Sequence, residues 1–148
     1  MPAVHYDSYT DARAHFKDLL DAAERGMVAT VRRDSGRAAV VDAERLRRYL
    51  ALLCPRAEAV SEEDGWSLYF PGLPIAADGA TLEAAITEMI CALREYAEDW
   101  NDHLSTAPNH QGNWGLVQLV GISDDAQLRG WLVGEDESPS PSKTSTRL

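Results

Sequence analysis

Proline 55 divides this sequence into two parts with different patterns. The preceding segment, AERLRRYLALL at residues 43–53, places its apolar side chains on one face of a helix that Asp42 can cap. Proline has no backbone N–H and clashes with the preceding turn, so the helix must end near Cys54. We therefore expect one small domain over residues 1–54 and another over residues 55–134.

The first part predicts a β-α-β-β-α order. Thr10 is a plausible N-cap and Gly26 a plausible end for a single first helix. Two strands follow, MVATVRR and RAAVV, joined by the turn DSG. The expected buried stripe of the helix comprises Ala12, Phe16, Leu19, Leu20 and Ala23.

The second part begins with two strands, RAEAV and WSLYF, around the acidic turn SEEDG. The segment PGLPIAADGA has room for a short third strand. Thr81 then caps a long helix that runs to about residue 103. The apolar run WGLVQLVGI, residues 114–122, is predicted as a strand, and Ser123 or Asp124 starts a last short helix through Leu132. Residues 135–148 are charged and rich in serine and proline, so we expect a disordered tail.

Charge differs between the two parts. The chain has a formal net charge of -10, yet residues 1–53 carry nine basic against eight acidic side chains. Residues 54–148 carry five basic against sixteen acidic ones. Parts of such different charge often face different partners, although an acidic surface also serves simply to keep a protein soluble.

Several classes of protein are disfavoured by composition and motifs. No apolar run approaches the roughly 20 residues of a membrane span, and the N-terminus lacks a secretory signal pattern. Cys54 and Cys91 lie far apart without a zinc-ligand pattern. His103 and His110 flank a loop, a common arrangement that gives little support for catalysis. We expect a cytoplasmic protein that is not an enzyme, with no catalytic residues, no metal and no cofactor.

Arginines gather around the predicted hairpin TVRRDSGRAAVV, residues 30–41. Successive strand residues face opposite sides, so Arg32 and Arg33 cannot both enter a core. Guanidinium groups beside the N-terminus of a helix suit phosphates and guanine edges. This pattern is compatible with DNA binding, although arginines at hairpin tips are usually just solvated. The candidate DNA-binding residues are Thr10, Arg13, Arg32, Arg33 and Arg37.

Residues 9–50 resemble the Phd/YefM antitoxin family. The family's opening pattern matches Thr10-Asp11-Ala12-Arg13, and its hairpin turn matches Arg33-Asp34-Ser35-Gly36. The resemblance implies a homodimer whose first domain binds operator DNA through Arg13 and Arg33. Arg32 and Arg37 are added because they lie close to this turn.

Residues from about 57 to 133 resemble a HicB-like antitoxin domain. The matching segments are WSLYFPGLP and DGATLEAAITEMICAL. The resemblance implies a partial ribonuclease-H-like fold, with an antiparallel sheet and one long helix. It also implies that this domain binds a toxin.

Taken together, the two resemblances imply an α+β protein that acts as the antitoxin of a type II toxin–antitoxin system. We expect a homodimer that neutralises a cognate toxin, in such systems often a basic ribonuclease, and represses its own operon. Aromatic side chains dominate interface hot spots, so Trp66, Tyr69 and Trp131 are the candidate toxin contacts, with core packing as the alternative for each. The alternatives are a stand-alone regulator whose second domain binds a ligand or protein, and an interaction module without DNA binding. Neither the toxin class nor the operator sequence follows from the residues.

Overall fold

The computed structural model describes residues 4–135, so the tail expected at residues 135–148 lies almost entirely outside the described residues. Residue contacts group the chain into two compact units, Met1–Arg48 and Tyr49–Leu148, which we call unit 1 and unit 2. The division falls inside helix α3 (Ala43–Leu53), a few residues before the expected boundary at residue 54. Each unit is described by itself.

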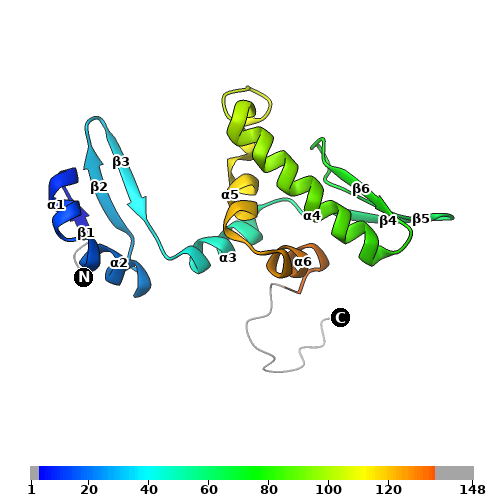
Figure 1. The fold of residues 1–148 in the computed structure, drawn as a ribbon, viewed down its shortest axis with the longest axis horizontal. Coiled ribbons are helices and arrows are strands. Elements are labelled where there is room, and N and C mark those ends of the chain that lie inside the picture. Colours follow the sequence, from blue (N-terminus) through cyan, green and yellow to red (C-terminus); the bar gives the residue numbers. More distant parts are fainter. Residues whose placement is uncertain (1–3, 136–148) are drawn as a thin grey trace. The chain divides into compact units, whose positions relative to one another are not determined.

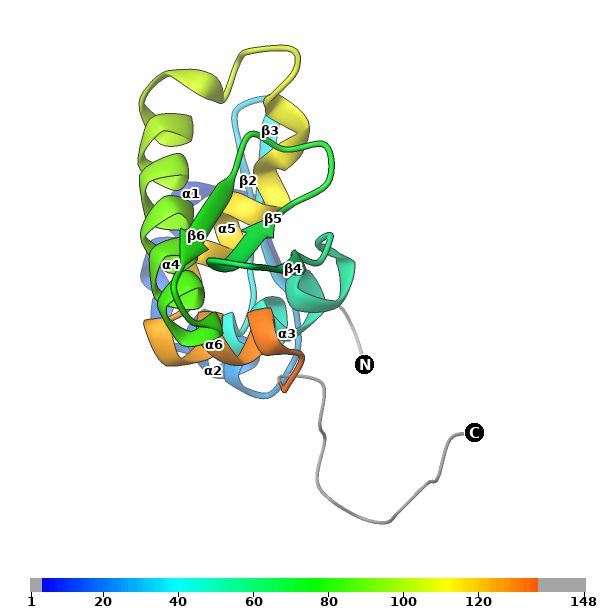
Figure 2. The ribbon, with the colours of Figure 1, turned by 90° about the vertical axis from the view of Figure 1, so that its right-hand side faces the viewer.

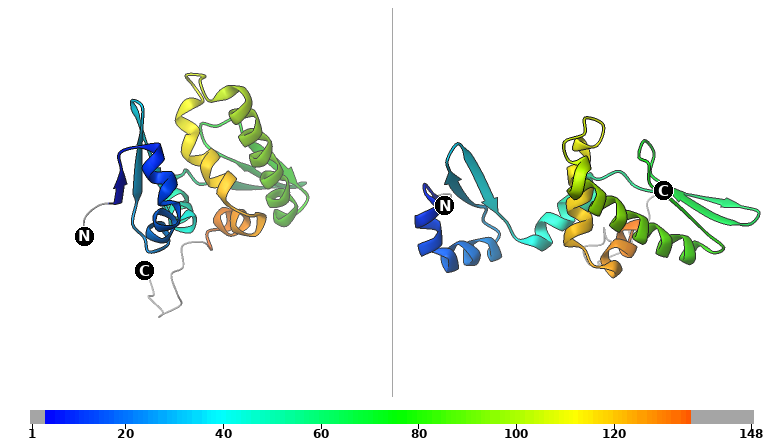
Figure 3. Two further views of the ribbon diagram at one scale, coloured as in Figure 1. Left: turned by 60° about the vertical axis from the view of Figure 1, so that its left-hand side comes forward. Right: turned by 45° about the horizontal axis from the view of Figure 1, so that its top comes forward.

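Unit 1 is built on a three-stranded sheet with the order β1-β2-β3 (Figure 1). Strand β1 pairs in parallel with β2, and β2 pairs antiparallel with β3. Helices α1 and α2 both contact β2, and Figure 3 shows them on one side of the sheet. The elements are β1 (Val4–Tyr6), α1 (Tyr9–Ala14), α2 (Phe16–Glu24), β2 (Ala29–Arg33) and β3 (Gly36–Val40).

The expected single first helix is wrong, because the chain breaks it at His15. This residue leaves helical geometry, with φ -118° and ψ 31°, and its ring stacks on Tyr6 of β1 at 5.8 Å between centroids. Its Nδ1 lies 3.0 Å from the carbonyl oxygen of Asp11, so the ring also caps the end of α1. The N-cap is Ser8 rather than Thr10, since the Ser8 hydroxyl accepts the Asp11 N–H at 3.1 Å. Gly26 ends α2 with φ 89°, as expected.

The core of unit 1 is small. Ala12, Leu19 and Ala29 are buried, and four apolar side chains pack around them, namely Val4, Tyr6, Val31 and Val40. The break at His15 turns α2 relative to α1, so the predicted stripe is only partly buried. Phe16 is 58% exposed and Leu20 is 42% exposed. A helix face with two large apolar side chains is thus left uncovered in a single chain.

Unit 2 contains an antiparallel sheet with the order β4-β5-β6 and a long helix, α4, packed against β5 and β6 (Figure 2). Helices α5 and α6 also contact α4. A π-helical turn, Trp100–Leu104, extends α4, and a short 3-10 turn, Gln111–Asn113, precedes α5. The remaining elements are β4 (Glu58–Glu62), β5 (Gly65–Tyr69), β6 (Ala76–Gly79), α4 (Leu82–Asp99), α5 (Trp114–Ile122) and α6 (Asp125–Val133).

The strand predicted for residues 114–122 is wrong, because this segment is helix α5. Its apolar run has no alternation, and a buried helix and a buried strand cannot be separated by periodicity in so short a run. In α5 the buried side chains follow helical spacing, at Leu116, Val117, Leu119 and Val120. The β-branched valines and the two glycines of this segment disfavour a helix. Packing against α4 outweighs these preferences, so the segment folds as a helix.

The predicted starts of the other helices in unit 2 are confirmed. The Thr81 hydroxyl accepts the N–H of Ala84 at 3.1 Å at the start of α4. Asp124 caps α6 in a capping box with Gln127. Gly79 has a special role between β6 and α4, because a Cβ atom there would lie 2.3 Å from the backbone nitrogen of Ala85. Glycine thus allows the end of β6 to pack directly on the first turn of α4.

Candidate functional site

The arginine-bearing hairpin of unit 1 is made by β2 and β3. Arg33 lies opposite Gly36, so Asp34 and Ser35 form the two-residue turn between the strands. Asp34 adopts φ 52°, a left-handed conformation that aspartate tolerates better than most side chains. This tight turn fixes the direction of the arginines on either side.

Arg33 points to the helical side of the sheet. It shares a face of β2 with Ala29, which is fully buried in the core of unit 1. At the end of that face its guanidinium carbon lies 5.6 Å from the ring centroid of Tyr9, in cation–π geometry. Tyr9 is the first residue of α1, and Arg13 follows it by four residues, which places both on one side of the helix. Tyr9 therefore contacts Arg33 and shares a helix face with Arg13. Sequence reasoning missed Tyr9 because its link to Arg33 is a contact between distant segments.

Arg32 and Arg37 lie on the other face of the hairpin. They are directly opposite each other in the β2–β3 register. Like charges in such a cross-strand pair repel and destabilise the sheet unless an anion relieves them. Among residues 4–135, no carboxylate forms an ion pair with Arg13, Arg32, Arg33 or Arg37. Four unneutralised guanidinium groups thus surround the hairpin of an acidic protein.

Thr10 is exposed on α1 but does not cap the helix. The N–H of Asp11 is already bonded to Ser8, and α1 has only six residues. The expected contribution of a helix N-terminus to anion binding is therefore weakened, and the candidate site consists of the arginines on both faces of the hairpin together with Tyr9. We call Tyr9, Arg13, Arg32, Arg33 and Arg37 the hairpin cluster.

The three aromatic side chains predicted as toxin contacts do not form one surface. Trp131 is 2% exposed, stacks on Phe70 at 5.8 Å and donates its Nε1–H to the carbonyl of Ala51 at 3.2 Å. Trp66 is half-buried on the face of β5 that α4 covers. Tyr69 is exposed on the opposite face of the same strand.

The Tyr69 side chain is already engaged on that face. Its hydroxyl donates a hydrogen bond to the Glu58 carboxylate, which raises the pKa of Tyr69. Trp131 acts as a core residue, so only Tyr69 and part of Trp66 stay available as contacts.

The other candidate reactive groups give no sign of a catalytic or metal centre. Burial raises the pKa of the Cys54 thiol, which disfavours the reactive thiolate. Tyr96 bonds to Nδ1 of His110 at 2.8 Å, so this histidine has a structural partner. Within residues 4–135 no three His, Cys, Asp or Glu side chains gather in a way that would hold a metal ion. No helix of that described range combines the length and hydropathy needed to cross a membrane.

A comparison with protein families matches residues 4–130 to a PHD-like family, described as the antitoxin of a toxin–antitoxin, RelE/RelB, TA system. This chain belongs to that antitoxin family. The match spans nearly all the described residues and covers both units with one family. A toxin is the partner that the family's description implies.

A solved structure shares the fold of this antitoxin. It is the crystal structure of the antitoxin part of a proposed toxin/antitoxin system from Syntrophomonas wolfei subsp. wolfei. The TM-score is 0.71 at 20% sequence identity, over 88% of this chain and 96% of the other chain. A comparison with curated protein sequences finds no match.

Proposed function

We propose that this antitoxin represses its own operon through unit 1 and neutralises its toxin through unit 2. The hairpin cluster is the single observation that carries the DNA-binding half of this proposal. Within residues 4–135 its arginines have no carboxylate partners, and two of them repel each other across the hairpin. Phosphate oxygens would neutralise them, and a guanidinium can also read a guanine edge in two hydrogen bonds.

A homodimer would present this cluster twice. Two equivalent clusters could then meet successive half-sites of a pseudo-palindromic operator about one helical turn apart. The uncovered face of α2, with exposed Phe16 and Leu20, supports dimer formation by unit 1. The small core of this unit supports it as well, because a domain of about 50 residues rarely buries enough apolar surface alone.

The acidic charge of unit 2 supports a basic toxin as its partner. This half carries sixteen acidic against five basic side chains from residue 54 onward. The family's RelE/RelB description favours a RelE-type ribonuclease as the toxin. Charge complementarity of this kind raises the association rate and disfavours wrong partners.

Toxin neutralisation is tested by growth rescue. The gene adjacent to this one is the candidate toxin gene, and it is expressed from an inducible promoter, with and without this chain on a second plasmid. We expect growth arrest by the neighbour alone and recovery when the full chain is present. If the neighbouring protein arrests growth and the full chain does not restore it, the proposed toxin pairing is wrong.

Repression is tested with a reporter gene behind the chain's own upstream DNA. Wild-type protein should lower reporter output, and replacing both Arg13 and Arg33 by alanine should restore it. Arg48→Ala is the matched control, because Arg48 is an exposed arginine outside the hairpin cluster, where it pairs with Glu44. Equal repression by the double variant and the wild type would contradict the assigned interface.

A further inference from the structure

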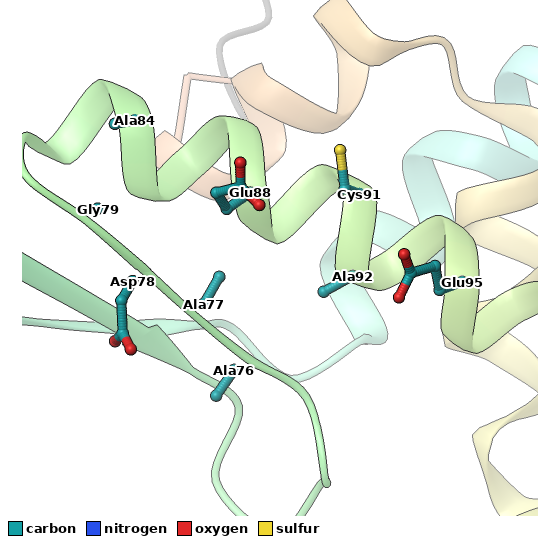
Figure 4. A pocket seen from close by; sticks show the side chains of 9 residues that line it. All are labelled: Ala76, Ala77, Asp78, Gly79, Ala84, Glu88, Cys91, Ala92 and Glu95. Carbon is teal, nitrogen blue, oxygen red and sulfur yellow. The ribbon is translucent and has the colours of Figure 1, made fainter.

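A groove of about 460 Å³ runs between β6 and α4 in unit 2. One wall is the strand itself, and the other is a single stripe of α4 at helical spacing (Figure 4). The lining residues are Ala76, Ala77, Asp78 and Gly79 from β6, and Ala84, Glu88, Cys91, Ala92 and Glu95 from α4. A strand edge beside a helix forms the kind of site in which an extended peptide adds to a sheet.

The outer edge of β6 carries unused backbone groups. Among residues 4–135 this strand pairs only with β5. The N–H of Phe70 donates to the carbonyl of Ile75 at 3.2 Å, just beyond the β5–β6 ladder. Because bonded and non-bonded pairs alternate in antiparallel sheets, Ala77 and Gly79 then bond to β5. The N–H and C=O groups of Ala76 and Asp78 are left directed toward the free edge.

The turn between β4 and β5 supports this assignment independently. Its two residues, Glu63 and Asp64, join the paired residues Glu62 and Gly65. A two-residue turn closes on a hydrogen-bonded pair, so alternation directs Leu68 toward β6 and its partner Ala77. Both ends of the sheet give the same pattern.

The groove is narrow, and most of the side chains that face an incoming strand are small. It therefore suits an extended backbone rather than a bulky side chain. Ala77 points toward α4, whereas Asp78 is directed to the other side of the sheet (Figure 4). The facing residues Ala84 and Ala92 add only methyl groups. An incoming strand could therefore approach the edge of β6 without displacing large side chains.

The charge of the groove selects its occupant. Glu88 and Glu95 line it with their carboxylates, whereas the Asp78 carboxylate lies on the other side of the sheet and accepts a hydrogen bond from Ser67. Among residues 4–135, no basic side chain lines the groove. Glu88 and Glu95 form no ion pair or hydrogen bond within the described part of the chain. A cationic segment would find two uncompensated carboxylates along α4 while its backbone pairs with β6.

We propose that a cationic, extended segment of the toxin adds to the free edge of β6 as a fourth strand. Its Lys or Arg side chains would lie against Glu88 and Glu95. This inference rests on the proposed neutralisation of a toxin by unit 2, and it names the surface that does so. It also explains why a short, alanine-rich strand is left open beside an acidic helix stripe.

Proline scanning of the two sheet edges tests the proposal. Ala76→Pro removes an N–H directed to the free edge of β6, where proline is compatible with the fold but blocks strand addition. Ala59→Pro is the matched control, because alternation directs Ala59 to the opposite free edge, on β4. The binding partner is the purified product of the neighbouring toxin gene. We expect at least tenfold weaker binding for Ala76→Pro and unchanged binding for Ala59→Pro.

Hydrogen exchange of the wild-type complex tests the same contact without relying on a variant. The amides of Ala76 and Asp78 should exchange fast in the free chain and slowly in the complex, whereas those of Ala59 and Ser61 should stay fast. Replacing Glu88 and Glu95 by glutamine should slow association several-fold at low salt. The same change at Glu62 and Glu63, in the β4–β5 turn, should have little effect.

Each outcome decides between the two proposals. If the wild type binds the neighbouring protein but Ala76 and Asp78 gain no protection, strand addition is wrong and toxin binding stands. If these amides are already protected in the chain alone, a second copy occupies the edge, which also overturns the inference. If the wild type binds no neighbouring protein, the proposed toxin pairing itself fails, together with the site assigned to it.

Discussion

Glu44 shows how a single carboxylate organises the middle of α3. It accepts two bonds from the buried Arg47, at 2.9 and 2.6 Å, and one from the exposed Arg48 at 3.2 Å. The hydrogen bond from Arg47, together with the charges of both arginines, holds the pKa of Glu44 below its usual value of 4.5. Because folding lowers the pKa of Glu44, its ionised carboxylate stabilises the folded state at any pH above the pKa of the unfolded chain. This stabilisation is lost as the pH falls through the lower pKa of the folded chain.

We therefore expect a pH-dependent loss of stability in Glu44→Gln. At pH 7 the variant should be less stable by about 0.5 kcal/mol, because the carboxylate is partly exposed and screened. The difference should shrink as the pH falls below 4.5, because Glu44 is protonated first in the unfolded chain and then, at its lowered pKa, in the folded chain. Thermal unfolding followed by circular dichroism at pH 7 and pH 3.5 checks this. A difference that grows toward low pH would contradict the assigned ion pair.

Tyr96 holds the loop after α4 in place. Its hydroxyl lies 2.8 Å from Nδ1 of His110 and accepts a bond from the Asn113 side-chain amide, also at 2.8 Å. Tyr96→Phe leaves both partners unsatisfied, at a cost of about 1–2 kcal/mol. All four tryptophans lie in unit 2, so tryptophan fluorescence during urea unfolding reports this loss. An unchanged midpoint would mean that water replaces the hydroxyl at no cost.

At the scale of single residues, the sequence shows which side chains are unusual for the chain, but not which side chains they contact. The hairpin arginines stand out in an acidic chain, but the link from Arg33 to Tyr9 depends on folding. Trp131 was expected to contact the toxin, but it is buried in the core. From the sequence alone, an aromatic residue at this position fits an interface or a core equally well. Tertiary packing alone decides such cases.

At the scale of single helices, the start of α1 offers a test of the assigned N-cap, with a neighbouring residue as the control. Ser8 and Thr10 are both good capping residues, yet only the Ser8 hydroxyl bonds to the N–H of Asp11. Ser8→Ala should cost about 1 kcal/mol and speed hydrogen exchange in α1, whereas Thr10→Ala should change stability little. The reverse order would show that the helix begins at Thr10 after all.

Among the features expected of the helices, the caps at Thr81 and Asp124 and the helix end at Gly26 were predicted correctly. These residues act through local chemistry, which the sequence shows directly. The break at His15 was not predictable, since it depends on stacking with Tyr6 from another element. The helical state of residues 114–122 was missed for a related reason. Its apolar run is compatible with either structure until α4 covers it.

For the whole molecule, we expect dimer formation through unit 1. Phe16→Glu with Leu20→Glu places charges on the uncovered face of α2, so two copies should repel and separate. Each side chain is already well exposed in one chain, so folding should be affected little. Sedimentation velocity should show monomers for this variant and dimers for the wild type and for Val60→Glu, an exposed control in unit 2. A dimer that survives would place the contact elsewhere.

The change of pattern at Pro55 predicts two domains, and residue contacts divide the chain into two compact units at a point inside α3. One antitoxin family spans both units, so the separate Phd/YefM and HicB-like resemblances stay interpretations of its two parts. The charge difference between the units gives this organisation a physical meaning. A nearly neutral unit, whose hairpin cluster has no carboxylate partner within residues 4–135, would suit DNA, and an acidic unit would suit a basic protein.

The most direct test of this account is the salt dependence of binding to the chain's own upstream DNA, measured by fluorescence anisotropy. Each phosphate contact that a protein makes adds about 0.9 to the slope of log affinity against log salt concentration. We predict sequence-preferring binding by the wild type, and a weaker affinity with a smaller slope when Arg13 and Arg33 are both alanine. The same affinity and slope for both proteins would contradict a DNA-binding role for the hairpin cluster.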